Sequence, residues 1–215
     1  MRAVVFDLDG TLVDTTGLIL NTYVETIRLL GGAEVTPEAV LSKFNIGPTP
    51  MLLEHFLGRP ISPEDLEAYF VAYEEAIASI QPFPGVPGLL QRLHRADYRL
   101  GLFTSATRRA VSLVLLRTGL DGYFEAIVAG DEVTYPKPAP EGLDLVCLKL
   151  GVRTEETAYI GDAAVDLACA SNARALGIQA LWGSAPELIA GNHAVANQPD
   201  EIVALIEGTN DAAPE

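Results

Sequence analysis

The chain has 215 residues, of which 49% are hydrophobic, and a net charge of -15 at pH 7. This length permits one large domain, or a main domain with a smaller insert, and the composition is sufficient for a buried core. A surface this acidic argues against nucleic acids and anionic membranes as partners, because both bind basic surfaces. No apolar run approaches the roughly 18 residues of a membrane span, and no signal peptide is recognisable, so the expected location is the cytoplasm.

The first expected element is a short apolar strand at residues 2–6. Asp7 and Asp9 follow it directly, and Gly10 marks a turn. We therefore expect both carboxylates at the carboxyl edge of a central strand, where open α/β sheets bind ligands. Neighbouring carboxylates repel each other unless a cation or a shared proton relieves them, and hard oxygen ligands suit Mg²⁺. The pattern favours a metal-assisted site over a simple acidic turn.

The next segment, residues 15–80, has helical periodicity and no strand pattern. Apolar residues recur there at three- and four-residue spacing, and Thr36-Pro37 is typical of a helix start. The segment predicts a small helical bundle inserted after the first strand. Its expected elements are a helix at 15–30, a helix beginning at Thr36, a loop at 45–50, and helices at 51–57 and 62–80.

The period changes after the Pro- and Gly-rich run at residues 82–88. Strands alternating with helices imply right-handed crossovers and a parallel, Rossmann-like α/β sheet with helices on both faces. The expected division is an α/β catalytic core at 1–14 and 82–215, with a helical unit at 15–81. Residues 209–215 are expected to be a frayed acidic tail. The predicted strands are 98–104, 126–129, 157–160, 178–182 and a stub at 193–196, and the predicted helices are 108–118, 140–150, 163–171, 186–190 and 200–207.

Three further polar segments follow expected strands. Thr104 and Ser105 lie where a strand meets a helix start and can hold an anion, or can merely cap the helix. Lys137, fixed between two prolines, can present one cation to a phosphate, although a solvated loop lysine has the same pattern. Asp162 and Asp166 are one helical turn apart and can face one metal, or Asp162 can be only a helix N-cap.

Together with Asp7-Leu8-Asp9-Gly10-Thr11, these segments resemble the four motifs of the haloacid dehalogenase-like hydrolase superfamily, in order and in spacing. The match covers nearly the whole chain, and the helical insert has the position of the superfamily's cap. Details in residues 44–48, 82–86 and 137–140 are similar to the phosphoglycolate phosphatase-like branch. The four-motif set is much more specific for the superfamily than for the substrate.

The resemblance implies a role for each matching residue. Asp7 would be the nucleophile that forms an aspartyl-phosphate, and Asp9 would protonate the leaving group and then activate water. Thr104 would hold a phosphoryl oxygen with support from Ser105. Lys137 would offset the charge of Asp7 and the phosphate. This plan suits phosphoryl transfer, which mainly needs alignment and charge neutralisation.

The resemblance also implies a metal site. Asp162 would bind Mg²⁺ together with Asp7 and the carbonyl of Asp9, with Asp166 in support, and Gly10 is assigned to the phosphate-binding loop. The expected function is Mg²⁺-dependent hydrolysis of a small phosphorylated metabolite, such as phosphoglycolate, by a monomer or homodimer. The alternatives are a β-phosphoglucomutase-type sugar-phosphate mutase and a catalytically silent binding or regulatory module.

The cap is expected to select the substrate, because the four motifs handle only the phosphoryl group and the metal. Residues 12–16 and 81–85 are the expected hinge. Lys43 and Asn45 are the cap residues assigned to the leaving group, although Lys43 is equally typical of a solvated helix end. Cys147 and Cys169 match no metal motif and are expected to be buried apolar residues.

Overall fold

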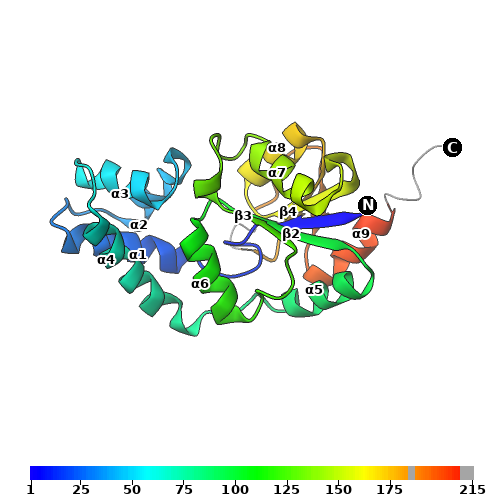
Figure 1. Ribbon diagram of the computed structural model, residues 1–215, viewed down its shortest axis with the longest axis horizontal. Coiled ribbons are helices and arrows are strands. Elements are labelled where there is room, and N and C mark those ends of the chain that lie inside the picture. The colour runs from blue at the N-terminus through cyan, green and yellow to red at the C-terminus, as the bar shows by residue number, and fades with distance from the viewer. Residues whose placement is uncertain (184–186, 209–215) are drawn as a thin grey trace.

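The computed structural model describes residues 1–183 and 187–208, apart from the side chain of Asn45. Its centre is a six-stranded, fully parallel sheet with the strand order β3-β2-β1-β4-β5-β6 (Figure 1). Strand β1 is therefore central, between β2 and β4, as the prediction of a buried first strand requires. The strands are β1 (Ala3–Phe6), β2 (Arg99–Phe103), β3 (Ala126–Val128), β4 (Thr157–Gly161), β5 (Leu176–Ala180) and β6 (Ala194–Ala196).

Helices cover both faces of this sheet, because alternate residues of a strand point to opposite faces. In β1, Val4 and Phe6 pack into one apolar cluster, and Ala3 and Val5 into the other. Helices α7 and α8 cover the Val5 face, and α5, α6 and α9 the opposite one (Figure 1). The expected Rossmann-like α/β fold is confirmed. These helices are α5 (Val86–Arg95), α6 (Arg108–Thr118), α7 (Glu141–Leu150), α8 (Ala164–Ala173) and α9 (Ile202–Gly208).

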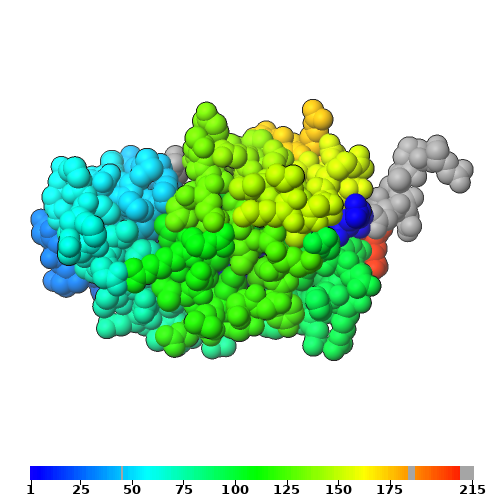
Figure 2. All heavy atoms as spheres, viewed as in Figure 1, coloured from blue at the N-terminus to red at the C-terminus, as the bar shows by residue number. Residues whose placement is uncertain are grey.

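A helical insertion separates β1 from β2 and lies beyond one end of the sheet (Figure 1). Two of its helices start at favourable caps: the Thr36 hydroxyl accepts from the Ala39 N–H at the start of the second helix, and Ser62 and Asp65 form a reciprocal capping box at the start of the fourth. Figure 2 shows the insertion, in blue and cyan, as a lobe against the green surface of the core. The helices are α1 (Thr16–Leu29), α2 (Pro37–Leu41), α3 (Thr49–Leu57) and α4 (Pro63–Ala76), with 3₁₀ turns η1 (Phe44–Ile46) and η2 (Ile77–Ser79).

The sequence prediction lacks one core helix, α5. Val86, Leu89, Leu90 and Leu93 recur at helical spacing and are fully buried. The prolines and glycines before them suggest a loop, but Pro87 lies in the first turn, where a missing N–H costs nothing. The predicted loop at 45–50 is also shorter than expected, because η1 and the start of α3 occupy part of it.

The helix predicted at residues 186–190 is wrong for its described part, 187–190. The buried Gln179 side chain occupies the backbone groups there, donating to the Glu187 carbonyl at 2.8 Å and accepting from the Ile189 N–H at 3.0 Å. The first residue of this prediction, Pro186, and the predicted tail at 209–215 lie outside the described residues. Within the described chain, the helices are too short or too polar to cross a membrane.

The two connections to the insertion lie against each other. Val13 and Pro82 form an antiparallel bridge, and the Phe83 N–H donates to the Leu12 carbonyl at 2.9 Å. The chain therefore enters and leaves the insertion at one point of the core.

Candidate active site

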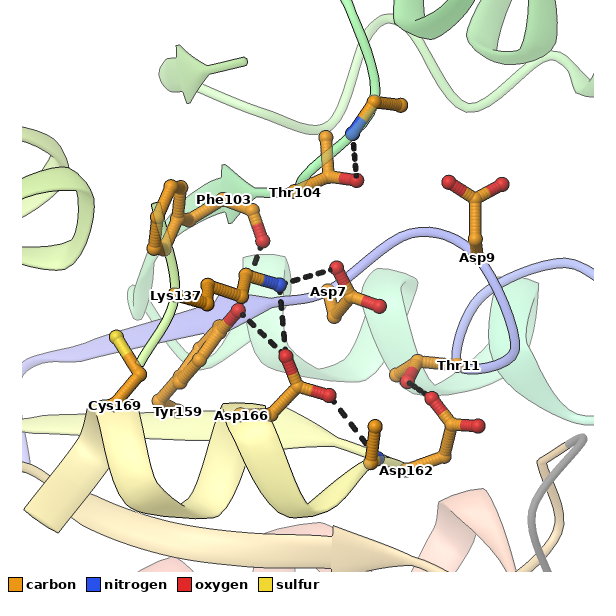
Figure 3. A network of polar contacts seen from close by, with 12 residues as sticks. Asp7, Asp9, Thr11, Phe103, Thr104, Lys137, Tyr159, Asp162, Asp166 and Cys169 are labelled. Carbon is orange, nitrogen blue, oxygen red and sulfur yellow. Dashed lines mark hydrogen bonds and ion pairs between the residues drawn. The ribbon is translucent and has the colours of Figure 1, made fainter. Parts of the chain in front are cut away.

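The site is built where β1 and β4 end at the same edge of the sheet (Figure 3). The Asp7 N–H donates to the Ile160 carbonyl at 2.8 Å, so the pairing with β4 continues one residue beyond β1. Asp162 follows β4, and Thr104 follows β2. Parallel pairing thus brings together residues that are more than one hundred positions apart, as the strand-end motifs predict.

Lys137 lies at the centre of this edge (Figure 3). Its ammonium donates to Asp7 Oδ1 at 2.7 Å and to Asp166 Oδ1 at 2.8 Å. The side chain is only 3% exposed, and Nζ lies 5.0 Å from the ring centroid of Phe103 and 5.3 Å from that of Tyr159. Lys137 is therefore a buried, doubly paired cation and not a solvated loop lysine.

The electrostatics of the pair follow from burial and proximity. Burial raises the pKa of Asp7 well above its ordinary value, and the Lys137 charge opposes that rise. Burial alone would lower the pKa of Lys137, but the neighbouring carboxylates of Asp166 and Asp7 more than reverse this and raise it. Lys137 consequently stays charged at neutral pH and fixes the orientation of Asp7.

Three carboxylates form a cluster that can hold a cation. One oxygen each from Asp7, Asp162 and Asp166 lies within 4.8 Å of the others. Asp166 is already engaged, since Oδ1 accepts from Lys137 and, at 3.3 Å, from the Tyr159 hydroxyl, while Oδ2 accepts from the Ala163 N–H at 3.1 Å.

Asp7 and Asp162 are the members with spare oxygens. Asp162 Oδ1 accepts from Thr11 at 3.1 Å, and within the described residues its Oδ2 and the Oδ2 of Asp7 have no hydrogen-bond donor. Burial raises the pKa of Asp162 to about 6. Buried carboxylate oxygens with a surplus of negative charge are the donor set that Mg²⁺ prefers, so the residues fit this ion.

Glycines allow the backbone to approach this cluster. Gly10 has φ +82°, and a Cβ there would lie 2.5 Å from Asp162 Oδ2. Gly183 packs against the Gly10 carbonyl and Asp162 in the same way. Gly10, assigned from the sequence to the phosphate, is thus placed against Asp162.

The carboxylate of Asp9 lies apart from the cluster of three (Figure 3). It is half-buried and accepts a hydrogen bond from the Thr15 hydroxyl at 2.5 Å. Burial raises the pKa of Asp9, and the Thr15 hydrogen bond opposes that rise. Because Thr15 immediately precedes α1, the orientation of Asp9 is linked to the base of the insertion.

Thr104 is buried, and its hydroxyl accepts from the Ala106 N–H at 3.1 Å. The residue that caps α6 is Thr107, whose hydroxyl accepts from the Ala110 N–H. Thr104 and the exposed Ser105 are therefore not helix caps. Likewise, Asp162 is not the N-cap of α8: the N-cap residue is Ala163, whose N–H donates to Asp166.

A cavity of about 510 Å³ lies between the insertion and the core, and all of these carboxylates, with Lys137, Thr104 and Ser105, line it. Of the two insertion residues assigned to the substrate, Lys43 is exposed and is not among the lining residues. The side chain of Asn45 lies outside the described part of the structure.

Sequence reasoning missed three polar partners: Thr11, Thr15 and Tyr159. The Tyr159 hydroxyl donates to the Phe103 carbonyl at 2.9 Å beneath Lys137. Thr11 and Thr15 belong to the stretch that carries Asp7 and Asp9, so their proximity in sequence was the available signal. The sequence pattern around Tyr159 indicates only an apolar strand residue.

This arrangement defines an α/β enzyme with an acidic, lysine-containing site at the carboxyl edge of its sheet. The profile of the family described as haloacid dehalogenase-like hydrolase matches residues 4–180. The chain therefore belongs to that family, as the motif resemblance predicted.

Known relatives agree with this assignment. The chain is 32% identical over 208 residues to the pyrophosphatase PpaX of Listeria innocua, which covers 93% of this chain and 90% of that protein. It is 30% identical over 184 residues to the phosphoglycolate phosphatase of Aquifex aeolicus, with 85% and 86% covered. The structure of CbbY from Rhodobacter sphaeroides in complex with phosphate shares the fold, with TM-score 0.82, 24% identity and coverage of 94% and 96%. The expectations of a phosphatase and of the phosphoglycolate phosphatase-like branch are confirmed.

Proposed function

We propose that this phosphatase is Mg²⁺-dependent and hydrolyses a small phosphomonoester through an aspartyl-phosphate on Asp7. The observation that carries the proposal is the fixed position of Asp7, whose Oδ1 is held by buried Lys137 while its Oδ2 has no donor among the described residues. A carboxylate anchored through one oxygen presents the other to an incoming phosphorus atom.

The remaining residues suit the two half-reactions. Lys137 offsets charge on the phosphoryl oxygens, and Thr104 lines the cavity as a hydroxyl partner for one of them. Asp9, with a raised pKa, donates a proton to the departing oxygen and then takes one from the hydrolytic water. Mg²⁺ held by Asp7 and Asp162, with Asp166 oriented beside them, would neutralise charge on the transferred group.

The helical insertion at 15–81 acts in this proposal as a cap over the α/β core. Support comes from the cavity, which both parts line, and from the contact between the two connections at Val13 and Pro82. A rotation at these connections would open and close the cavity, so that water is excluded during the first half-reaction. The relatives' names make phosphoglycolate and pyrophosphate the reference substrates for this site.

The test is phosphate release by the wild type and by Asp7→Asn, with and without Mg²⁺. The isosteric Asn removes the nucleophile, so turnover should fall by about 10²- to 10⁶-fold while the thermal unfolding transition remains cooperative. Asp121→Asn, at an exposed turn, is the matched control and should keep wild-type turnover.

Two results would contradict the proposal: wild-type turnover by Asp7→Asn, or full activity after exhaustive chelation. Analysis of the product also separates the alternatives. A phosphatase releases inorganic phosphate, a mutase returns an isomeric sugar phosphate, and a silent module yields neither.

A further inference from the structure

We propose that the leaving group of the substrate is an uncharged alcohol with a substantial apolar body, and not a second anion. This inference rests on the proposed phosphatase function and concerns the part of the cavity that the core motifs do not explain. It follows from the chemistry of the cavity wall, from the positions of the cationic side chains, and from the acidic residues that the core contributes to the cavity.

The insertion contributes an apolar, hydroxyl-bearing wall to the cavity. Among its described side chains that line the cavity, none is ionised at neutral pH. The hydroxyls of Ser42 and Thr49 belong to the same wall. The large side chains on this wall are Ile19, Tyr23, Leu41, Phe44, Leu52, Tyr69 and Tyr73.

The tyrosines of this wall are packed together. The rings of Tyr23 and Tyr69 lie 4.7 Å apart between centroids, and those of Tyr69 and Tyr73 are stacked at 5.9 Å. Burial raises the pKa of Tyr23 to about 12 and raises those of Tyr69 and Tyr73 well above their ordinary value. The phenols therefore remain neutral, and this part of the wall is aromatic and carries no positive charge.

The cations of the insertion lie elsewhere. Arg28 and Lys43 are exposed, and Arg59 is bound to Asp65 at 2.5 and 3.1 Å. None of these three, which are all the Lys and Arg residues of positions 15–81, lines the cavity. A carboxylate or phosphate on the leaving group would therefore meet no described cation on the insertion side.

The core cannot supply the missing charge. Among the described core residues that line the cavity, the one cation is Lys137, which is already paired with Asp7 and Asp166. Asp9, the proposed proton donor, adds a further acidic group where the leaving oxygen would lie. A second anion on the leaving group would be desolvated with no described cationic side chain free to pair with it, which is costly at low dielectric.

The size of the cavity agrees with a larger alcohol. At about 510 Å³ it is in the range of pockets that enclose drug-sized ligands, roughly 300–1,000 Å³. Two relatives are named for pyrophosphate and phosphoglycolate. In both substrates the leaving group is a small anion: phosphate in pyrophosphate and glycolate in phosphoglycolate. The proposal therefore separates this chain from both relatives in substrate class.

Matched pairs of substrates test this inference, because the members of each pair differ by one carboxylate. Ethyl phosphate is compared with phosphoglycolate, and benzyl phosphate with 4-carboxybenzyl phosphate, with pyrophosphate as a further anionic substrate. In each pair we expect the neutral ester to have the higher kcat/KM, by at least about tenfold for the benzyl pair. Equal or higher kcat/KM for the acidic members would overturn the inference.

A cation placed on the wall should reverse part of this preference. Ser42 is exposed and lines the cavity, so Ser42→Arg adds a charge at low structural cost, and Ser42→Gln is the uncharged control. Ser42→Arg should reduce the ratio of kcat/KM for benzyl phosphate to kcat/KM for 4-carboxybenzyl phosphate about two- to fivefold, which is the effect of a half-exposed ion pair. Ser42→Gln should leave this ratio unchanged. Lys43→Ala should leave the ratio unchanged, and a selective loss of the acidic substrates in this variant would contradict the inference.

Calorimetric binding of phosphonates separates this inference from the proposed function. Benzylphosphonate should bind the wild-type protein more tightly than phosphonoacetate, whether or not any ester is hydrolysed. If no ester releases phosphate but this order of affinities is found, the proposed function fails and the inferred ligand class stands. If phosphate release is Mg²⁺-dependent but phosphonoacetate binds as well or better, the function stands and the inference fails.

Discussion

The hydroxyl of the buried Tyr159 lies beneath the carboxyl edge of the sheet, next to the ion pair of Lys137. It contacts the Phe103 carbonyl at 2.9 Å and Asp166 Oδ1 at 3.3 Å, and Asp166 in turn holds Lys137. Burial raises its pKa well above the ordinary value, so it acts as a neutral donor. Tyr159 thus connects two strands to the ion pair without lining the cavity.

Tyr159→Phe should lower the free energy of unfolding by about 1–3 kcal/mol, because it leaves a buried carbonyl without its side-chain donor. Denaturant unfolding measures the change, and Tyr135→Phe, at an exposed position, is the control that should unfold like the wild type. Equal midpoints for all three proteins would show that the Tyr159 hydroxyl does not stabilise the fold.

At this scale the sequence predicts the charged residues better than their partners. Asp7, Asp162 and Thr104 follow strands, and a parallel sheet brings strand ends together whatever the details of packing. Tyr159 could not be predicted in this way, since its partner Phe103 is 56 positions away and the contact depends on the stagger of β2 and β4. The expected contact between Lys43 and a substrate stays a prediction, and the structure shows this side chain exposed.

Helices α4 and α6 meet across the boundary between the insertion and the core. Arg109 of α6 forms a two-bonded ion pair with Glu67 of α4, at 2.5 and 2.9 Å, and lies 3.6 Å from Glu74. Its guanidinium carbon is also 4.2 Å from the ring centroid of Phe70. This one arginine therefore joins three residues of α4 to the core.

Arg109→Ala should loosen the insertion and leave the sheet intact. The variant loses both the ion pair and the cation–π contact that join Arg109 to α4. Hydrogen exchange should therefore become faster in α4 than in α7. The control is Arg108→Ala, because Arg108 pairs with Glu132 within the core and its loss should affect residues 130–132 instead. Unchanged exchange in α4 would mean that Arg109 does not hold the insertion.

Most elements could be predicted because their periodicity agrees with their local signals. The helix at Pro63–Ala76 begins at a Ser-Pro start, and the strand at Thr157–Gly161 is a continuous buried run. The two largest errors occur where a long-range contact or a proline determines the local structure. Residues 187–190 bond to Gln179 of β5, and the proline-rich start of α5 hides a strongly amphipathic helix.

The acidic cluster affects the whole molecule through the linkage of protonation to folding. The pKa of Asp162 is about 6 in the folded chain and about 3.9 in an unfolded one, because burial disfavours the charged form. Between these values the folded state binds more protons than the unfolded state. Stability without metal therefore decreases as the pH rises through this window and becomes independent of Asp162 above it.

We accordingly expect the melting temperature of the chelated protein to be higher at pH 5 than at pH 7, with a smaller difference in Asp162→Asn. Saturating Mg²⁺ should raise the melting temperature more at pH 7, because carboxylate ligands bind a cation only when deprotonated. Thermal scans at the two pH values, with chelator or Mg²⁺, measure both effects. An Asp162→Asn protein with the wild-type pH and Mg²⁺ responses would exclude Asp162 as their source.

The bridge between Val13 and Pro82 has a consequence for how such a chain can diversify. Because the two ends of the helical segment are neighbours, a segment of another length or shape can occupy the same junction without moving β1 or β2. Closing such a loop becomes only slowly less favourable as it lengthens. The residues proposed to bind the phosphoryl group lie on the core side of this junction, and the apolar wall of the cavity lies on the insertion side. Chimeras joined here can therefore acquire a new selectivity while they inherit the same chemistry.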